Sequence, residues 1–128
     1  MSLNHVAIIM DGNRRWAKSM GLSLKDAYEH GVKNLYDTIE NSIILKLKFL
    51  TVFGFSTENW NRSSKEIGFL LDLFNQFLDK AISSTRSKNI KIRFIGDLDK
   101  FNSEIQKKIN FLMFDSRENS AITVTLAV

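Results

Sequence analysis

Two clusters of polar side chains contain the residues that could do chemistry, and each cluster directly follows a short apolar run. Residues 11–16 follow the apolar run 6–10, and residues 56–62 follow the apolar run 50–55. Both runs predict buried strands, and an open α/β sheet binds its ligands just beyond the carboxyl ends of its strands. We therefore expect the clusters to lie together, where a carboxylate among arginines and amides fits a diphosphate with its metal ion. The side chains expected there are those of Asp11, Asn13, Arg15, Ser56, Glu58, Asn59 and Arg62.

In the first cluster, Gly12 would permit a tight turn from strand to helix. The N–H groups at the start of that helix would face an anion, and the planar guanidinium of Arg15 matches phosphate oxygens. The Asp11 carboxylate would repel a phosphate, so its use would be to hold a divalent cation that the phosphate shares. The alternative is that Asp11 only caps the helix and that the arginines are solvated.

In the second cluster, Ser56 and Asn59 could hydrogen-bond a substrate or a phosphate. Arg62 adds an anion contact, and Trp60 provides an aromatic surface beside that charge. The alternative is that Ser56 or Thr57 caps a short helix and that Trp60 belongs to the core. Two such clusters at adjacent strand ends favour the functional interpretation of both.

Three residues outside the clusters also draw interest: His30, Gly31 and Asp97. A single helical histidine is usually a surface residue, but a glycine inside a helix costs roughly 1 kcal/mol relative to alanine. Gly31 therefore indicates close packing, or a ligand near His30. Asp97 follows the third predicted strand, and we expect it to cap the next helix.

Strands and helices alternate along the chain and would position these residues. Apolar runs predict strands over 5–10, 49–55, 90–95 and 121–127, and apolar spacings of three and four predict helices over 24–46, 64–85 and 99–115. The order β-α-β-α-β-α-β predicts an α/β fold with a parallel sheet flanked by helices, in one domain over 1–128. The first strand is almost wholly apolar, so we expect burial on both of its faces. The third alternates, so we expect it near an edge or with one solvated face.

The helix over 64–85 has a wider apolar stripe than one core contact needs. Ser63 and Glu66 form a capping-box pattern at its start, and Phe69, Leu73 and Ile82 broaden the stripe. Either the helix is sandwiched between the sheet and another helix, or it forms the wall of an apolar channel for a long hydrocarbon. The pattern leaves both interpretations open.

Composition excludes several classes of protein. The chain has 128 residues, of which 44% are hydrophobic and 25% charged, so it is large enough for a core and is not a disordered chain. With no cysteine and two histidines, neither disulfides nor a histidine-rich zinc site is expected. No segment approaches the roughly 18 apolar residues of a membrane helix, and no signal peptide is expected. We infer an intracellular, cytoplasmic protein whose metal ion would be a hard one such as magnesium.

The net charge of +4 is modest, and the basic residues are scattered. That argues against a nucleic-acid-binding domain and suits an anionic small ligand or an anionic membrane surface equally well. The motifs of P-loop nucleotide binding, of dinucleotide binding and of the hydrolase nucleophile elbow do not occur in the sequence.

The two clusters and two shorter segments resemble the cis-prenyltransferase family. The matching segments are 5–18, 30–32, 50–62 and 95–97. The resemblance runs in register over the whole chain, which covers the first half or so of the family's length. It implies an enzyme that adds isopentenyl diphosphate to an allylic diphosphate such as farnesyl diphosphate, with Mg²⁺. It also implies a homodimer at full length, transient contact with the inner membrane surface and no nucleic-acid partner.

The resemblance also assigns roles to individual residues. Asp11 would associate with the magnesium ion. The residues expected to act in catalysis are Asp11, Asn13, Ser56 and Asn59. Those expected to bind substrate are Gly12, Arg14, Arg15, Trp16, His30, Glu58, Trp60 and Arg62. The helix after Arg62 would line the tunnel for the growing chain.

The sequence departs from the family pattern at three positions. Where the family usually has Arg-x-x-Gly-His, this chain has Asp26 and Glu29 ahead of His30, and carboxylates there would weaken diphosphate binding by repulsion. Gly54 stands where the family often has alanine and would leave room in the tunnel. The alternative function is therefore a non-catalytic module that binds a prenyl diphosphate or serves as a partner subunit. Nucleic-acid binding is a third possibility, for which steep salt dependence would be expected.

Overall fold

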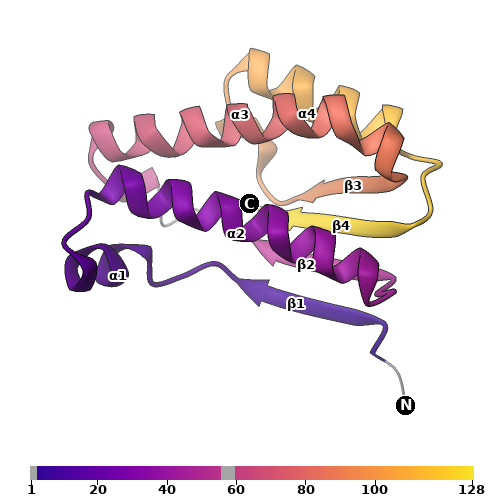
Figure 1. Ribbon diagram of the computed structural model, residues 1–128. Helices are drawn as coiled ribbons and strands as arrows, with labels where there is room; N and C mark the ends of the chain where they lie inside the picture. Colours follow the sequence, from indigo (N-terminus) through magenta and orange to yellow (C-terminus); the bar gives the residue numbers. More distant parts are fainter. Residues whose placement is uncertain (1–2, 56–59) are drawn as a thin grey trace.

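The computed structural model describes residues 3–55 and 60–128 (Figure 1). Its strands are β1 (His5–Ile9), β2 (Phe49–Phe53), β3 (Ile90–Ile95) and β4 (Ile122–Ala127). Its helices are α1 (Asn13–Met20), α2 (Leu24–Ile44), α3 (Ser64–Lys88) and α4 (Ser103–Asp115), with a 3₁₀ turn η2 (Leu98–Lys100). The strands and the three longer helices lie where the sequence patterns predict them. The short helix α1 is an addition to the predicted alternating order.

The described strands form one parallel sheet in the order β1-β2-β4-β3. This confirms the predicted fold class, an α/β protein with a parallel sheet flanked by helices. In Figure 1 the strands point toward the end of the sheet at which α1 lies. The loops that follow β1 and β2 therefore start side by side, because these two strands are neighbours.

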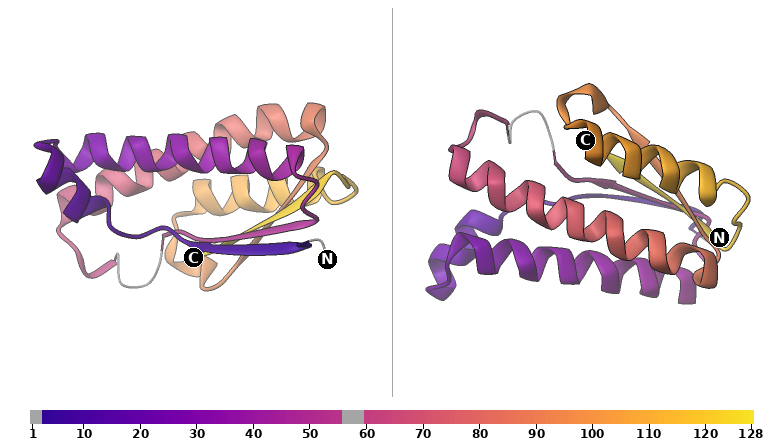
Figure 2. Two further views of the ribbon diagram at one scale, coloured as in Figure 1. Left: turned by 60° about the horizontal axis from the view of Figure 1, so that its bottom comes forward. Right: turned by 90° about the horizontal axis from the view of Figure 1, so that it is seen from above.

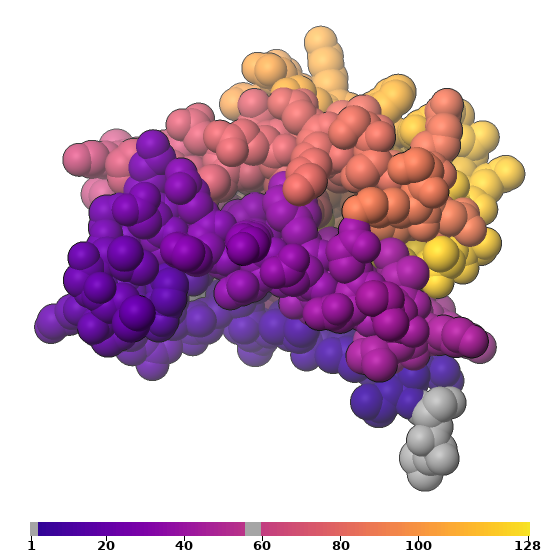
Figure 3. All heavy atoms as spheres, viewed as in Figure 1, coloured from indigo at the N-terminus to yellow at the C-terminus, as the bar shows by residue number. Residues whose placement is uncertain are grey.

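Helices α2 and α3 lie side by side over one face of the sheet (Figures 1 and 2). In the space-filling view they form a continuous surface, with α1 at one end (Figure 3). Helix α4 lies against α3, where the Lys108 ammonium is 2.8 Å from the Asp79 carboxylate. It also lies along β3. Ser116, the residue just after α4, accepts the Ile92 N–H with its hydroxyl at 3.0 Å. None of the described helices is long and apolar enough to cross a membrane.

The core lies between this helical layer and alternate residues of the sheet. Leu50, Val52 and Val124 point into it and are almost completely buried. Successive side chains of a strand point to opposite faces, so one face of each strand supplies the core. From the helices, Leu78 and Leu112 are fully buried against it.

The apolar strand β1 is not buried on both faces, contrary to the prediction. Ile9 is 73% exposed, and Phe53 and Ile95 on the same face of the sheet are also exposed. The reason is that β1 lies at one edge of the sheet and no described helix covers this face. Strand β3 lies at the other edge with one buried face, which confirms the prediction for 90–95.

The structure confirms one helix cap predicted from the sequence and contradicts another. The Ser63 hydroxyl accepts the Glu66 N–H at 3.2 Å and caps α3, as the capping-box pattern predicts. The helix predicted over 99–115 begins only at Ser103, and its cap is Asn102. The prediction that Asp97 caps this helix is wrong, because Asp97 precedes η2 and its side chain makes no capping hydrogen bond.

Candidate functional site

The two polar clusters start at the same end of the sheet and meet there. The Met10 N–H donates to the Phe53 carbonyl at 3.2 Å, just where β1 and β2 end. Beyond this point, Arg14 from the first cluster and Arg62 from the second both bind the Glu66 carboxylate. The described parts of the two clusters therefore lie together, as predicted. Four residues of the second cluster lie outside the described residues: Ser56, Thr57, Glu58 and Asn59.

A pocket of about 190 Å³, which we call the polar pocket, opens between the first cluster, α2 and Arg62. It is lined by Met10, Asp11, Gly12, Asn13, Arg14, Arg15, Tyr28 and Arg62. These described lining residues carry three guanidinium groups and one carboxylate, which gives them a net positive charge. Guanidinium forks match phosphate oxygens, so the pocket suits an anion of the size and charge of a diphosphate.

The turn from β1 into α1 depends on Gly12. This residue occupies the N-cap position of α1 with a φ of 88°, a left-handed conformation that glycine adopts without strain. Among the described residues, no side chain caps α1, so its first N–H groups can face an anion. The Asp11 carboxylate instead accepts the Gly12 N–H at 2.7 Å. The alternative that Asp11 caps the helix is therefore wrong.

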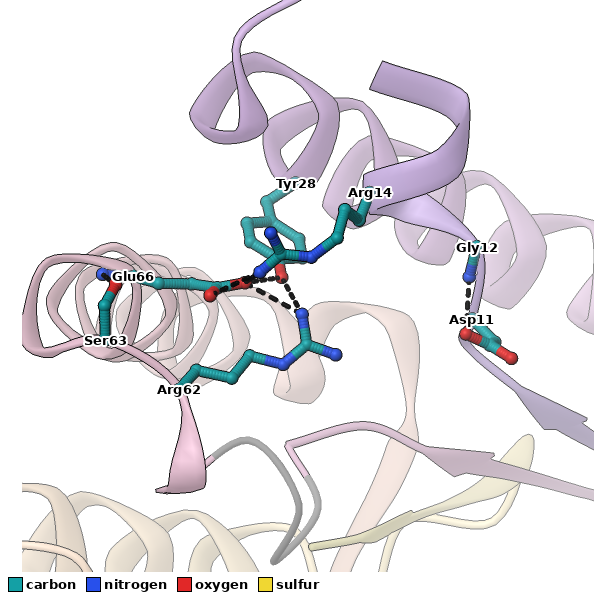
Figure 4. A network of polar contacts seen from close by, with 7 residues as sticks. All are labelled: Asp11, Gly12, Arg14, Tyr28, Arg62, Ser63 and Glu66. Carbon is teal, nitrogen blue, oxygen red and sulfur yellow. Dashed lines mark hydrogen bonds and ion pairs between the residues drawn. The ribbon is translucent and has the colours of Figure 1, made fainter. Parts of the chain in front are cut away.

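A buried carboxylate, Glu66, connects three structural elements beside the polar pocket (Figure 4). Arg14 Nη2 of α1 donates to both of its oxygens, at 2.9 and 2.7 Å. The Tyr28 hydroxyl of α2 donates to Oε1 at 2.6 Å, and Arg62 Nη1 donates to the same oxygen at 2.9 Å. Arg62 Nη1 also donates to the Tyr28 hydroxyl at 3.2 Å. We call these four side chains the Glu66 network.

The protonation states within the Glu66 network follow from burial and charge. Burial would raise the pKa of Glu66, but hydrogen bonds from Tyr28 and Arg62 and the charges of Arg62 and Arg14 lower it below its ordinary value. Burial, followed by the hydrogen bond to Glu66, raises the pKa of Tyr28 to about 12. Near neutral pH, Glu66 is therefore an anion and Tyr28 a neutral donor.

Neither Tyr28 nor Glu66 is among the site residues predicted from the sequence. Glu66 was interpreted only as half of a capping box, although it also lies four residues after Arg62, a spacing at which opposite charges meet on a helix. Tyr28 falls within the helix predicted over 24–46, and no motif distinguishes it there. Its hydroxyl reaches Glu66 because of how α2 packs against α3, which the local pattern does not show.

Next to the polar pocket lies an apolar cavity of about 130 Å³ between α2, α3 and the sheet. Helix α3 contributes Leu70, Leu73, Phe74 and Phe77 to its wall. The same helix packs against α2, where Tyr36 stacks on Phe77 with 5.7 Å between ring centroids. The wide apolar stripe therefore serves packing against the sheet and a neighbouring helix, as one interpretation predicts. The interpretation as the wall of a channel for a long hydrocarbon stays a prediction.

Comparison with known proteins identifies the family. The prenyltransferase family model, described as undecaprenyl diphosphate synthase, matches residues 9–128. The chain belongs to this undecaprenyl diphosphate synthase family. It is 36% identical over 126 residues to an isoprenyl transferase of Campylobacter jejuni, covering 98% of this chain and 57% of the relative. It is 38% identical over 123 residues to the farnesyl-diphosphate-specific ditrans,polycis-undecaprenyl-diphosphate synthase of Pasteurella multocida, covering 96% and 51%.

A solved structure of the family has the same fold. Lavandulyl diphosphate synthase from Lavandula x intermedia, in complex with dimethylallyl diphosphate, superposes with a TM-score of 0.90 at 35% identity. The match covers 98% of this chain and 54% of that one. The chain thus spans about half the length of the relatives it matches, which confirms the resemblance to the first half of the family.

The family resemblance implies a magnesium ion, and Asp11 is the carboxylate in the polar pocket. It is three-quarters exposed, and Arg15 Nη2 lies 3.4 Å from its Oδ2. Among the described residues, no group of three or more His, Cys, Asp and Glu side chains is arranged to hold a metal ion. Magnesium in proteins commonly uses one or two carboxylates plus the phosphate oxygens of a substrate. Asp11, the one carboxylate among the described residues that line this arginine-rich pocket, fits such a shared cation.

Asn13 and Tyr28 line both the polar pocket and the apolar cavity, whereas His30 and Trp16 line neither. The His30 and Trp16 rings meet edge to face, with 5.2 Å between centroids. Gly31 lies against Asn13, whose Oδ1 would be 3.1 Å from a Cβ at this position. Close packing therefore accounts for Gly31, and the substrate-binding role expected of His30 stays a prediction.

Trp60 packs in an aromatic cluster, as its core interpretation predicts. Its ring centroid lies 4.8 Å from that of Phe55 and 5.7 Å from that of Phe101.

Asp26 and Glu29 are the two carboxylates that depart from the family pattern. Both are exposed on α2, and neither lines the polar pocket. Solvent therefore screens their charges from that pocket, and the expected repulsion is reduced.

Proposed function

We propose that this chain binds an allylic diphosphate such as farnesyl diphosphate. We further propose that it serves as part of a prenyltransferase that condenses isopentenyl diphosphate onto it to make a long cis-polyprenyl diphosphate. One observation carries the proposal: the polar pocket and the apolar cavity share Met10, Asn13 and Tyr28 in their walls. A ligand with an anionic head and a hydrocarbon tail fits two such adjoining spaces.

The polar pocket would bind the diphosphate and stabilise the charge that gathers on it when its bond to the allylic carbon breaks. Arg14, Arg15 and Arg62 would donate to the phosphate oxygens, together with the first N–H groups of α1. A magnesium ion held by Asp11 would supply further positive charge to the leaving group. Asn13 would orient the ligand where the two spaces join. We keep Ser56, Glu58, Asn59 and Trp60 as proposed residues near the reacting centre.

The apolar cavity would hold the first part of the hydrocarbon tail and keep water from it. Its present volume of about 130 Å³ is small, so a longer chain would require α2 and α3 to move apart. Apolar contact with α3 would contribute affinity in proportion to the area buried, roughly 25 cal/mol per Å². Head and tail should therefore both contribute to binding.

A second candidate function is a non-catalytic module that binds a prenyl diphosphate or acts as a partner subunit. It is favoured by the carboxylates Asp26 and Glu29, which stand ahead of His30 where the family usually has arginine and glycine. The two candidates predict the same ligand and differ only in turnover.

Equilibrium binding tests what the two candidates have in common. Titration calorimetry with farnesyl diphosphate, pyrophosphate and farnesol, each with Mg²⁺, should give the tightest binding for farnesyl diphosphate. The reason is that only this ligand fills both spaces. Absence of farnesyl diphosphate binding at millimolar concentration would contradict both candidates.

Incorporation of labelled isopentenyl diphosphate into long polyprenyl product, with Mg²⁺ and farnesyl diphosphate, then separates them. Turnover by the 128-residue chain supports the enzyme, and binding without turnover supports the binding module.

The remaining proposals concern the surroundings of the protein. We propose a cytoplasmic location, transient contact with an anionic membrane surface, and a homodimer at full length. Co-sedimentation with anionic vesicles and light scattering test the last two. Nucleic acid is not a proposed partner, and oligonucleotide titrations at low and high salt check this expectation.

A further inference from the structure

Glu66 is the most buried ionised group in the described part of the chain that the proposed chemistry does not use directly. It is 5% exposed and lies in the first turn of α3. It does not line the polar pocket, whereas its three partners, Arg14, Tyr28 and Arg62, all do. Apart from the long-range effect of its charge, Glu66 can therefore act on a bound ligand only through these partners (Figure 4).

We propose that Glu66 is a positioning residue that fixes Arg14, Arg62 and Tyr28 at the wall of the polar pocket before a diphosphate arrives. This inference rests on the proposed function, because it assumes that the polar pocket binds a diphosphate. It adds a role for a residue outside the pocket and joins the three elements from which the pocket is built.

The geometry supports positioning because the Glu66 carboxylate binds groups from separate segments. Arg14 donates to both carboxylate oxygens from α1, and Arg62 and Tyr28 converge on Oε1 from the loop before α3 and from α2. An ionised carboxylate loses its hydration when buried, so it requires such partners. The requirement is mutual, since the network keeps two guanidinium groups together that would otherwise repel each other.

Holding the arginines in advance lowers the cost of binding. A long arginine side chain loses rotamer freedom when it binds a ligand, and this cost is smaller where the side chain is already ordered. Only Nη2 of Arg14 contacts Glu66. A guanidinium has five N–H donors in a fixed fork, so Arg14 can bind Glu66 and a phosphate oxygen together.

Positioning and simple electrostatics predict opposite effects when the charge of Glu66 is removed. The carboxylate makes the potential around the polar pocket less positive. If its charge alone mattered, Glu66→Gln would bind a diphosphate more tightly than the wild type. If Glu66 positions the arginines, Glu66→Gln binds a diphosphate more weakly, although the pocket has become more positive.

The test compares the affinities of variants for Mg²⁺-pyrophosphate, Mg²⁺-farnesyl diphosphate and farnesol by calorimetry at one pH and ionic strength. Glu66→Gln should weaken both diphosphates about tenfold, as expected for disturbed charge-assisted hydrogen bonds. Glu66→Asp keeps the charge but withdraws the carboxylate by one methylene, and it should also weaken them. Farnesol binding should be unchanged, which a general loss of structure would not allow.

Two control variants carry the same kinds of substitution at residues away from the polar pocket. Glu104→Gln removes an exposed negative charge on α4, where Glu104 pairs with Lys108 at 3.6 Å. Tyr36→Phe removes a phenol from the same helix as Tyr28, at a ring that stacks on Phe77 away from the polar pocket. Neither control should change diphosphate affinity, whereas Tyr28→Phe should reduce it.

Each outcome decides the inference. Equal or tighter diphosphate binding by Glu66→Gln, with wild-type binding intact, would overturn the positioning role and leave the proposed function standing. If the wild type binds neither diphosphate, the proposed function fails and the inference falls with it. If circular dichroism shows that Glu66→Gln does not fold, Tyr28→Phe against Tyr36→Phe decides, and equal affinities of these two would overturn the inference.

Discussion

The Asn13 side chain of α1 occupies the space into which a side chain at Gly31 of α2 would project. The distance from Asn13 Oδ1 to a Cβ built on Gly31 is 3.1 Å, which is closer than an ordinary contact. This packing sets the position of Asn13, which lines both the polar pocket and the apolar cavity. The glycine at position 31 is therefore explained by its packing against Asn13, and not by any requirement of α2 itself.

Gly31→Ala should separate stability from affinity. Alanine is favoured over glycine in a helix by about 1 kcal/mol, while the Asn13 side chain must move by a few tenths of an ångström. We expect thermal stability to be unchanged or slightly higher. Farnesyl diphosphate affinity should fall about fivefold, equivalent to one disturbed hydrogen bond of about 1 kcal/mol.

Gly68→Ala on α3 is the matched control for this substitution. In the part of the chain that the structure describes, no atom outside the helix backbone lies within 4 Å of a Cβ at Gly68. The variant should be more stable by up to about 1 kcal/mol, with unchanged affinity. Thermal unfolding and calorimetry measure both quantities, and unchanged affinity of Gly31→Ala would remove the role given to Asn13.

Asp11→Ala should abolish the effect of magnesium on diphosphate binding. The Asp11 carboxylate is the acidic group in the polar pocket, and it is largely exposed. We expect the apparent Mg²⁺ affinity of the complex with pyrophosphate to fall on the order of 100-fold, while stability changes by less than about 0.5 kcal/mol. The exposed Asp97 supplies the control Asp97→Ala. Magnesium dependence that survives in Asp11→Ala would exclude the metal role of Asp11.

Gly54→Leu should distinguish the tail of the ligand from its head. Gly54 lines the apolar cavity, and no atom of the described residues beyond its chain neighbours lies within 4 Å of a Cβ there. A leucine can therefore extend into the cavity and compete with a hydrocarbon chain. We expect weaker binding of farnesyl diphosphate and unchanged binding of pyrophosphate, both measured by calorimetry. Equal weakening of the two ligands would mean that the cavity does not hold the tail.

Acid should destabilise the protein partly through Glu66. Its pKa is lowered in the folded state, so its ionised form contributes stability that is fully present above the ordinary value of 4.5. This contribution is lost as the pH falls below 4.5 through the folded pKa. Thermal unfolding from pH 7 to pH 3 should show a flatter acid limb for Glu66→Gln than for the wild type. Parallel acid limbs would contradict the ionised network.

Alkali should act on the same network through Tyr28. Its pKa is raised from 10.0 to about 12, so the neutral phenol contributes stability below pH 10 that is lost as the pH rises toward 12. Tyr28→Phe should weaken the alkaline dependence of unfolding, whereas Tyr36→Phe supplies the tyrosine background. Burial also raises the pKa of Tyr36, the other tyrosine of the chain. A spectrophotometric titration of tyrosinate should therefore lose its component near pH 12 in Tyr28→Phe and keep it in Tyr36→Phe.

The spacing of apolar residues predicted the strands and the longer helices, because this spacing depends only on residues that are close together in the chain. The strand predicted over 90–95 has those bounds in the structure, and Ser63 caps α3 as its motif predicts. The position of residues 11–16 beyond β1 also followed from sequence, since a short apolar run before a glycine predicts a strand end. The resemblance to the family rested on the same segments.

Other features depended on contacts between residues far apart in the chain. The exposure of Ile9 follows from the edge position of β1 and the uncovered face beside it, and apolar composition carries no information about either. The choice of Tyr28 over His30 at the pocket wall depends on the phase of α2 against its neighbours. Two residues along a helix differ by about 200°, so such a choice requires the packed structure.

The amino-acid sequence by itself determined the strands, the helices, the polar turns and the family of this protein, because these depend on residue type and short-range spacing. Only the tertiary structure decided that Glu66, capping partner of Ser63, would bind Arg14 from 52 positions earlier in the chain. The physical reason is that a buried carboxylate takes its partners from whatever the fold brings within reach. The packing of the helices, rather than the separation of the residues in the sequence, decides which side chains lie close to Glu66.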